Sequence, residues 1–161
     1  MPKHIKKREP TEILACDRRK LFCQECNEEV YAQCLTIEWY QHLSKSKFTR
    51  YTTDYHRHYN CLKCGCSVAC HKGTYEPVSR VIPSKAVRLG RELTFNLVAE
   101  INKEFNLKRV EIAQCLGFQH QNDIKSCEDI EQLRNAYRYG VKLREELRRI
   151  EDGTTNNATK V

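Results

Sequence analysis

The chain has 161 residues, and its 28 lysines and arginines against 21 aspartates and glutamates give a formal net charge of +7 at neutral pH. This length allows one ordinary domain, or a small metal-nucleated module followed by a helical one. No apolar run approaches the ~20 residues that cross a bilayer, and the basic N-terminus (MPKHIKKR) lacks the apolar stretch of a secretory signal. We therefore expect a cytoplasmic protein that is neither secreted nor embedded in a membrane.

The positive charge favours an acidic partner such as nucleic acid, but it does not decide the matter. The lysines and arginines are spread along the chain instead of forming one block. Many cytoplasmic proteins carry as much charge for solubility alone, and strong phosphate binding requires clustered cations. Nucleic acid and a protein target are therefore both candidate partners, and we expect no small-molecule substrate.

Residues 1–20 are predicted to form a basic flexible arm. This segment is rich in charge, contains Pro2 and Pro10, and offers only one short apolar run at residues 13–15. Such a composition buries too little apolar surface to offset the entropy that is lost when the chain becomes ordered.

Two short cysteine motifs carry the strongest signal in the sequence. Cys23 and Cys26 open the phrase CQECNEEV, and Cys61 and Cys64 open CLKCGCSV, so the pattern C-x2-C-x3-V occurs twice. Each copy has the form of a zinc knuckle, a tight turn in which two thiolates converge. Ten cysteines in a chain without a secretory signal favour metal binding over disulfides, with reduced, unligated cysteines as the alternative.

These four cysteines are predicted to hold one structural Zn2+. The two pairs are separated by 34 residues, an interval long enough for the chain to leave and return. Zinc accepts four sulfur ligands in a tetrahedral shell, and a site with four protein sulfurs leaves no position for a water molecule. The metal would then stabilise the fold without taking part in catalysis.

The segment between the cysteine pairs is predicted to be a β-hairpin. Residues 30–40 (VYAQCLTIEWY) and 48–59 (FTRYTTDYHRHY) are rich in β-branched and aromatic residues, and the second segment alternates with a period of two. The polar residues 42–47 would form the connecting loop, so that the second cysteine pair returns to the first. Residues 21–80 are thus predicted to form a zinc-ribbon module.

Further cysteines and histidines lie in or beside this module. Cys66, Cys70 and His71 are close enough in sequence to contribute to a second metal site, but the chain offers no further C-x2-C pair. The alternative is that Cys34 and Cys70 are small buried side chains on strands. The sequence leaves open the number of zinc ions beyond one and the roles of Cys16, Cys34, Cys115 and Cys127.

Residues 83–151 are predicted to form a helical module of about three helices. Pro83 can open the first helix, in which Leu93, Leu97, Ile101 and Phe105 form an apolar stripe. A shorter helix covers residues 108–116 and ends at a glycine.

A capping box of Ser126 and Asp129 is predicted to open the last helix, and residues 152–161 are predicted to be a disordered tail. The expected fold is α+β, with a zinc-ribbon β-hairpin module followed by a small helical segment.

The second cysteine motif and the residues after it, CLKCGCSVACHKGTYEP, resemble the signature of a zinc-finger-containing domain family of phages and bacteria. In that family an early C-x2-C pairs with a later C-x2-C, and a V-x-C-H-x-G-T-x2-P phrase and helices follow. The resemblance covers residues 21–105, and more weakly the remainder through Leu116-Gly117 and Cys127. It implies a zinc-binding module without an established activity, often encoded on mobile elements. The signature residues that it carries over are Cys70, His71, Gly73 and Thr74.

The first functional hypothesis is a non-catalytic nucleic-acid-binding protein. Aromatic side chains can stack on unpaired bases while arginines contact phosphates, which is how many proteins hold single strands. The alternative is that these tyrosines pack on the hairpin and the arginines are only solvated. The candidate contact residues of the ribbon are Arg50, Tyr51, Tyr55, Arg57 and Tyr59.

A variant of this hypothesis places DNA recognition in the helical module. Residues 109–118 (RVEIAQCLGF) are similar to the first helix and turn of a helix-turn-helix. If Ser126 caps the next helix, about nine residues separate the two helices, whereas the motif has a turn of about 3–4 residues. A helix beginning near His120 would restore the motif.

Two other function classes compete with nucleic-acid binding. The second hypothesis is a protein-interaction or inhibitory adaptor for which structural zinc provides only a scaffold. The third is an H-N-H-like zinc nuclease, suggested by His56, His58 and His71 beside a knuckle, but the spacing between histidine and asparagine is too short. The sequence also lacks the H-x-E and P-C-x-x-C motifs of zinc deaminases. We expect no enzyme activity.

Overall fold

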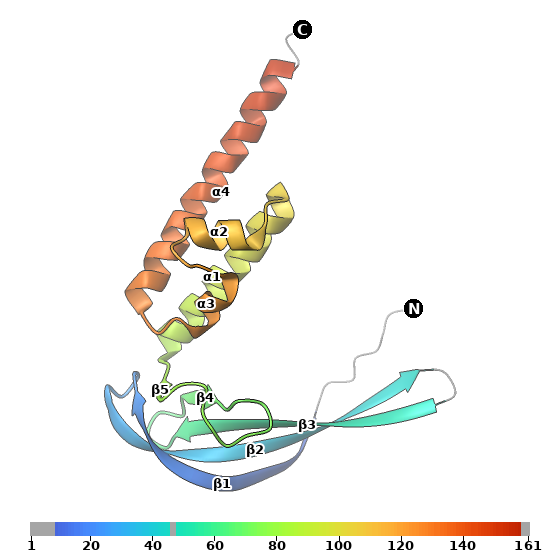
Figure 1. Ribbon diagram of the computed structural model, residues 1–161, viewed down its shortest axis with the longest axis vertical. Coiled ribbons are helices and arrows are strands. Elements are labelled where there is room, and N and C mark those ends of the chain that lie inside the picture. The colour runs from blue at the N-terminus through green and yellow to red at the C-terminus, as the bar shows by residue number, and fades with distance from the viewer. Residues whose placement is uncertain (1–8, 46–47, 159–161) are drawn as a thin grey trace. The chain divides into compact units, whose positions relative to one another are not determined.

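The computed structural model describes the backbone of residues 9–45 and 48–158, and the side chains of residues 17–36 and 57–153. The chain divides into two compact units, Met1–Ser84 and Lys85–Val161. The first contains a five-stranded sheet, and the second contains four helices in its described part (Figure 1). The mixed α+β class is therefore confirmed.

The sheet of the first unit has the strand order β4-β3-β2-β1-β5. Neighbouring strands pair in antiparallel fashion, except β5, which pairs in parallel with β1. The predicted hairpin is present as β2 and β3, although residues 42–45 of its expected loop belong to β2. The strands are β1 (Glu9–Cys23), β2 (Glu28–Lys45), β3 (Phe48–Cys61), β4 (Ser67–Ala69) and β5 (Val81–Ile82).

The prediction of a flexible arm over residues 1–20 is wrong for residues 9–20, which belong to β1, while residues 1–8 lie outside the described residues. β1 pairs with β2 along its length, from Glu9 with Tyr40 to Cys23 with Glu28. The strand tolerates its charged residues because a sheet with one solvated face needs apolar side chains only at alternate positions. Leu21 and Cys23 are buried, whereas Lys20 and Phe22 are exposed.

The core of the first unit lies on one face of the sheet. Along β2 the side chains at even positions from Val30 to Thr36 are buried, while Tyr31 is exposed. This period of two is what a half-buried strand requires. The buried residues of this core are Leu21, Cys23, Val30, Ala32, Cys34, Tyr59, Cys61, Cys66, Val68 and Ile82.

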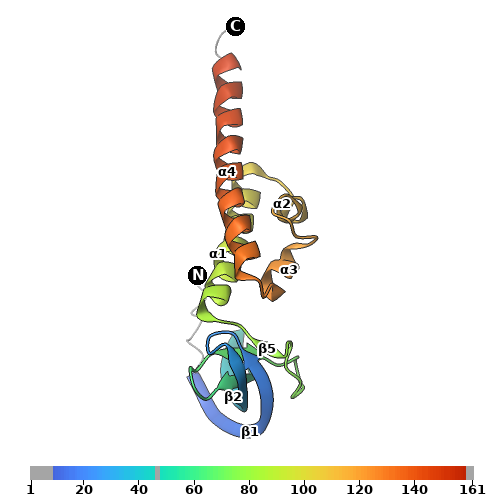
Figure 2. The same ribbon diagram turned by 90° about the vertical axis from the view of Figure 1, so that its left-hand side faces the viewer.

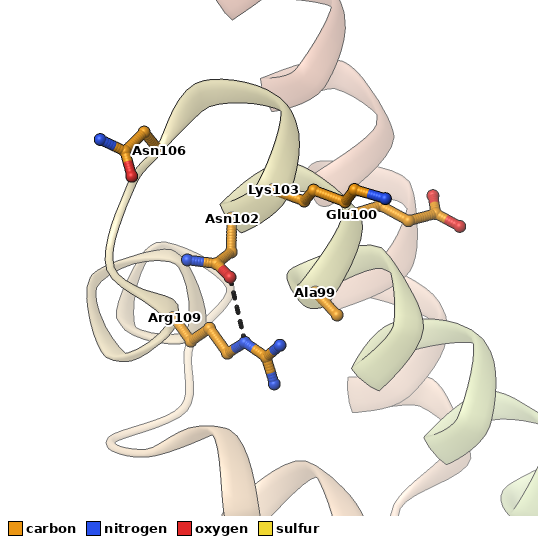
Figure 3. A pocket seen from close by; sticks show the side chains of 6 residues that line it. All are labelled: Ala99, Glu100, Asn102, Lys103, Asn106 and Arg109. Atoms are coloured by element: carbon orange, nitrogen blue, oxygen red, sulfur yellow. Dashed lines mark hydrogen bonds between the residues drawn. The ribbon is translucent and has the colours of Figure 1, made fainter. Parts of the chain in front are cut away.

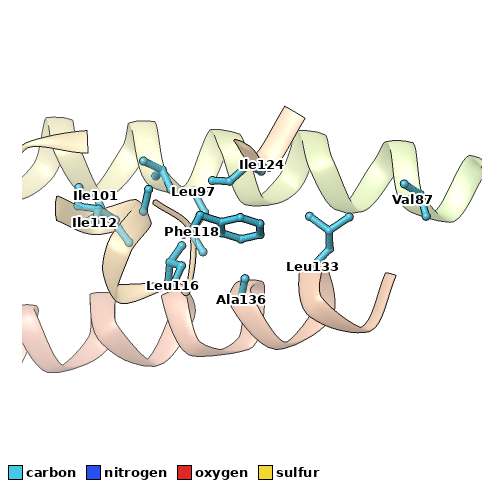
Figure 4. Close-up of a cluster of buried hydrophobic side chains, with 11 residues drawn as sticks. Val87, Leu97, Ile101, Ile112, Leu116, Phe118, Ile124, Leu133 and Ala136 are labelled. Carbon is cyan, nitrogen blue, oxygen red and sulfur yellow. The ribbon is translucent and has the colours of Figure 1, made fainter. Parts of the chain in front are cut away.

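The second unit is built on two long helices that lie side by side, α1 (Lys85–Phe105) and α4 (Ile130–Ala158), with α2 (Arg109–Cys115) and α3 (Gln121–Ser126) packed against α1 (Figure 2). Figure 4 shows the apolar side chains that meet between them. Of the predicted stripe on α1, Leu97 and Ile101 are buried, but Leu93 is 41% exposed. The remaining buried residues of α1 are Val87, Thr94 and Val98.

Three details of the helical prediction are wrong. The described part of the chain has four helices instead of about three, because the six-residue α3 was not expected. Ser126 ends α3 and does not cap α4. That cap is Asp129, whose Oδ1 accepts hydrogen bonds from the backbone N–H groups of Glu131 and Gln132 at 2.9 and 3.2 Å. Helix α4 also continues through residues 152–158 of the expected tail, since extending a helix costs less than starting one.

None of the helices in the described part of the chain has both the length and the apolar composition needed to cross a membrane.

Candidate metal centre

The two cysteine motifs form equivalent turns in the first unit. Cys23 ends β1 and Cys61 ends β3, and each is followed by a tight turn into the next strand. The residue after the second cysteine of each motif has a left-handed backbone, with φ of 54° at Asn27 and 77° at Gly65. Asparagine and glycine are the residue types that adopt this conformation at least cost. The motif is thus better written C-x2-C-[NG], a detail that the sequence already contained.

The turns bring four sulfur atoms together. The Sγ atoms of Cys23 and Cys64 lie 3.5 Å apart, and those of Cys26 and Cys61 lie 3.8 Å apart. All four ligand atoms lie within 4.8 Å of one another. A tetrahedral ion with metal–sulfur bonds of about 2.3 Å requires sulfur–sulfur separations of about 3.8 Å. The spacing therefore fits one four-coordinate ion.

The protonation of these thiols links metal binding to pH. Burial raises the pKa of Cys23 and of Cys26 above the ordinary thiol value. Burial acts in the same direction on Cys64, but the backbone N–H of Cys66, 3.5 Å from its sulfur, and the neighbouring thiols lower its pKa to about 7. A bound cation must displace the protons of the buried thiols, so rising pH favours binding.

A cation of the protein lies beside the cluster. Lys63, in the second turn, forms an ion pair with Glu28 that raises the pKa of Lys63, and the sulfurs of Cys26 and Cys61 raise it further. Four thiolates around one divalent ion leave a net charge of −2. The ammonium group of Lys63 is shared between Glu28 and the side of the cluster formed by Cys26 and Cys61.

The donor set restricts the kind of metal. Four sulfurs without a carboxylate suit a soft or borderline ion and exclude a magnesium or calcium site. Two ligands of the cluster are buried and two are half-buried, and all four positions are supplied by the chain. The arrangement can hold a metal ion in a structural role. The cluster consists of Cys23, Cys26, Cys61 and Cys64, as the spacing predicts.

The three residues considered for a second metal are not brought together. Among the residues that the structure describes, the four-cysteine cluster is the only group of three or more suitable ligands. Cys66 is buried beside Cys64, and burial raises its pKa to about 11. Cys70 pairs with Pro77 in an isolated bridge, and His71 is exposed.

The segment after the second knuckle forms a defined turn. The hydroxyl of Thr74 donates to the carbonyl oxygen of His71 at 2.9 Å, and Gly73 has φ of 75°. The backbone N–H of His71 donates to the carbonyl oxygen of Glu76 at 2.8 Å. These contacts show that Gly73 and Thr74 shape a turn.

Tyr59 anchors this turn to the sheet. Its side chain is completely buried, which raises the pKa of its hydroxyl, and the oxygen lies 3.1 Å from Asp17 Oδ2 and 2.8 Å from the carbonyl oxygen of Tyr75. Arg19 pairs with Asp17 and donates two hydrogen bonds to Glu76 at 2.7 and 2.9 Å. These roles of Asp17, Arg19 and Glu76 were not predicted, because the sequence around the first two residues is typical of a solvated arm.

This geometry removes part of the expected nucleic-acid surface. Tyr59 cannot stack on a base, because its ring is fully buried. Arg57 is half-buried, and its guanidinium carbon lies 4.3 Å from the ring centroid of Tyr75. The side chains of Arg50, Tyr51 and Tyr55 lie outside the described side chains, although their backbone belongs to β3.

Strands β2 and β3 continue to pair with each other beyond the point where β1 begins to pair with β2. The described pairing of β1 with β2 starts at Tyr40, whereas β2 and β3 pair from Gln41 with Thr52 to Lys45 with Phe48 (Figure 1). We call residues 41–52 the ribbon extension. Its sequence contains three cations and no acidic residue, and the cations are Lys45, Lys47 and Arg50.

No family model, curated protein or solved structure matches this chain significantly. The resemblance to the phage and bacterial family therefore stays a prediction.

Proposed function

We propose that this protein is a non-catalytic zinc protein that binds nucleic acid, with one structural Zn2+ in the four-cysteine cluster and the ribbon extension as a contact surface. The observation that carries the zinc assignment is the set of sulfur separations, which match the edges of a tetrahedral zinc–thiolate site. The overall module then has the character of a zinc ribbon, of the type that the family resemblance implies.

Zinc would join strand ends that are distant in sequence. Cys23 ends β1 and Cys26 precedes β2, whereas Cys61 ends β3 and Cys64 precedes β4. A small sheet buries little apolar surface, whereas binding of structural zinc contributes roughly 10 kcal/mol or more of folding free energy. The ion therefore offsets the entropy of ordering the long antiparallel strands that extend from the cluster.

The ribbon extension supports nucleic acid as the partner. Its charge is +3 over residues 41–52, with no acidic residue to cancel it, and it includes the aromatic residues Phe48 and Tyr51. Two paired strands fit the major groove of DNA, and aromatic residues among cations suit single strands. Of the expected contacts, Arg50 and Tyr51 lie in the ribbon extension, and Tyr55 lies just beyond it on β3. Tyr59 and Arg57 are excluded, because Tyr59 is buried and Arg57 packs on the ring of Tyr75.

The test compares two double variants that each remove two positive charges. Lys45→Gln with Arg50→Gln changes the ribbon extension, whereas Lys72→Gln with Arg80→Gln changes two exposed residues of the same unit. Native mass spectrometry should find one zinc ion in each protein. Fluorescence anisotropy with a single-stranded oligonucleotide measures the binding constant at several salt concentrations. The slope of log K against log[salt] should be smaller in magnitude by about 1.4 than that of the native protein for the first variant only.

Each result has a defined meaning. Equal binding by both variants would overturn the role of the ribbon extension. Absence of binding to single- and double-stranded oligonucleotides alike would overturn nucleic-acid binding and favour the protein-interaction adaptor. Absence of zinc from the native protein would overturn the metal assignment.

A further inference from the structure

Helices α2 and α3 are joined by the short turn that a helix-turn-helix requires. Helix α2 has its C-cap at Leu116 and α3 has its N-cap at His120, so residues 117–119 form the turn. The interval of about nine residues expected from the sequence was wrong because it placed the next helix after Ser126. A connection of about 3–4 residues containing glycine is typical of the motif.

The turn is fixed by its backbone hydrogen bonds. The N–H of Gly117 donates to the carbonyl oxygen of Gln114 at 3.1 Å, and the N–H of Phe118 donates to that of Ala113 at 3.0 Å. Together with φ of 91° at Gly117, these two bonds form a Schellman motif. A left-handed residue at this point is favourable for glycine, so the sequence determines where α2 ends and how the chain leaves it.

Apolar contacts hold both helices on α1. Ile112 and Ala113 of α2, Phe118 of the turn and Ile124 of α3 are all buried in one cluster (Figure 4). Ile124 is the only buried residue of α3. Of the rest of this helix, Gln121 is half-buried and the ammonium group of Lys125 lies 4.3 Å from the ring centroid of Phe95, while the other side chains are exposed.

The exposed face of α3 carries groups that form hydrogen bonds. Gln119, His120, Asn122 and Lys125 are exposed at its start and along it. The Nδ1 atom of His120 accepts a hydrogen bond from the backbone N–H of Asn122 at 3.1 Å. Neutral histidine then carries its proton on Nε2, which becomes a donor of fixed orientation. Asparagine and glutamine amides pair with adenine, and such donors suit guanine N7 or O6.

Two of the acidic residues in and beside the α2–α3 pair, Asp123 and Asp129, cap helices, and Glu111 and Glu128 also lie there. The carboxylate of Asp123 accepts a hydrogen bond from the backbone N–H of His120 at 2.9 Å, which completes a capping box. Asp129 caps α4. Part of their negative charge is therefore neutralised by the helix N-termini that they cap.

Cations flank the motif at the start of α2. Lys108 is exposed there, and Arg109 lies next to it. The Nε of Arg109 donates to Asn102 Oδ1 at 3.2 Å, which orients the guanidinium group along a shallow depression of about 460 Å³ beside α1 (Figure 3). In a helix-turn-helix the first helix crosses the DNA backbone, where such cations contact phosphates.

We propose that the α2–α3 pair binds duplex DNA, with the exposed face of α3 in the major groove and Lys108 and Arg109 on the neighbouring phosphates. This inference rests on the proposed nucleic-acid function and names the form of the partner. A six-residue helix is about 9 Å long, which spans about three base pairs of duplex. One chain therefore reads a short sequence.

The experiment selects a binding sequence from a random duplex pool with the full-length, zinc-loaded protein. Anisotropy then compares the selected duplex with a scrambled one. The double variant Gln119→Ala with Asn122→Ala should reduce the preference for the selected duplex by about 5- to 150-fold for each lost base contact. Lys108→Ala should weaken binding to both duplexes equally and reduce the salt slope by about 1.

Matched controls lie on the exposed faces of α1 and α4. Asn96→Ala and Lys142→Ala remove an amide and an ammonium group outside the motif, and both should bind as the native protein does. Circular dichroism checks that every variant keeps its helices. Native-like preference in the α3 double variant would overturn the inference. If the double variant Lys45→Gln with Arg50→Gln abolished binding to the selected duplex while the α2–α3 variants did not affect it, the inference would also fail. The proposed function would then stand. Absence of binding to any nucleic acid would overturn both.

Discussion

The hydroxyl oxygen of Tyr59 lies 2.8 Å from the carbonyl oxygen of Tyr75, at the point where the turn after the second knuckle meets β3. The same hydroxyl lies 3.1 Å from Asp17 Oδ2 on β1. One buried side chain therefore connects three segments that are far apart in sequence. Because a buried hydroxyl is costly to leave without a hydrogen-bond partner, these contacts should stabilise the first unit.

Tyr59→Phe should lower the free energy of unfolding of the zinc-loaded protein by about 0.5–1.5 kcal/mol, since it removes the hydroxyl that connects the Tyr75 carbonyl and the Asp17 carboxylate to β3. The zinc content should stay at one ion per chain. Chemical denaturation followed by fluorescence provides the measurement. Tyr31→Phe is the control, because Tyr31 is 66% exposed. A loss of stability as large in the control would contradict the role given to Tyr59.

Substitution of individual cysteines should separate ligands from neighbours. Cys61→Ser should abolish stoichiometric zinc binding, because three sulfurs leave the tetrahedral shell incomplete. Cys66→Ser and Cys115→Ser should retain one zinc ion per chain, since neither residue belongs to the cluster. Metal analysis after dialysis gives the result. The helical circular dichroism of Cys61→Ser should largely persist, because the second unit has its own core.

Loss of zinc from Cys66→Ser would show that the fifth sulfur takes part in coordination. Retention of zinc in Cys61→Ser would contradict the cluster itself.

The cysteine cluster could be predicted from the sequence because its signal is local. Two residues between cysteines define the turn, and the alternation in β2 and β3 defines the strands that bring the turns together. Strand β1 could not be predicted in this way. Its Asp17 and Arg19 suggest a solvated arm until their partners are known, and these partners, Tyr59 and Glu76, lie 42 and 57 residues away.

The helical unit shows the same limit at two places. A strict spacing of four residues rotates around a helix of 3.6 residues per turn, so Leu93 leaves the buried stripe that contains Leu97 and Ile101. Helix α3 has only one buried residue, so it produces no apolar period. Its signal is the capping box of His120 and Asp123, which a search restricted to serine or threonine caps does not find.

The ion pairs between α1 and α4 should make the stability of the second unit depend on acid pH. Glu104 lies 2.6 Å from both Arg148 and Arg144, and these arginines lower its pKa below the ordinary value of 4.5. A carboxyl group with a lowered folded pKa binds fewer protons when folded. The stabilisation that it provides is complete when the pH is above the pKa of the unfolded state, and it is lost as the pH falls through the pKa of the folded state.

Glu104→Gln should therefore be less stable than the native protein at neutral pH, and the difference should disappear at a pH below the folded pKa. Thermal unfolding of both proteins at several pH values measures this difference, in which the contribution of the cysteine cluster cancels. Glu92→Gln is the control on the same helix, since Glu92 makes no ion pair among the described residues. A constant difference across the pH range would contradict the assignment.

Gly140 lies at a close approach of α4 to the side chains of the core. A Cβ atom at this position would lie 2.6 Å from Leu97 Cδ2 and 3.3 Å from Leu116 Cδ2, and both leucines are buried. Gly140→Val should destabilise the second unit by about 1–3 kcal/mol through overpacking, despite the better helix propensity of valine. Gly153→Val is the matched control on the same helix, because a Cβ there meets no atom within 4 Å. It should change the stability by less than about 0.5 kcal/mol. Thermal unfolding followed at 222 nm compares the two, and equal effects would show that α4 does not pack at Gly140 as the structure describes.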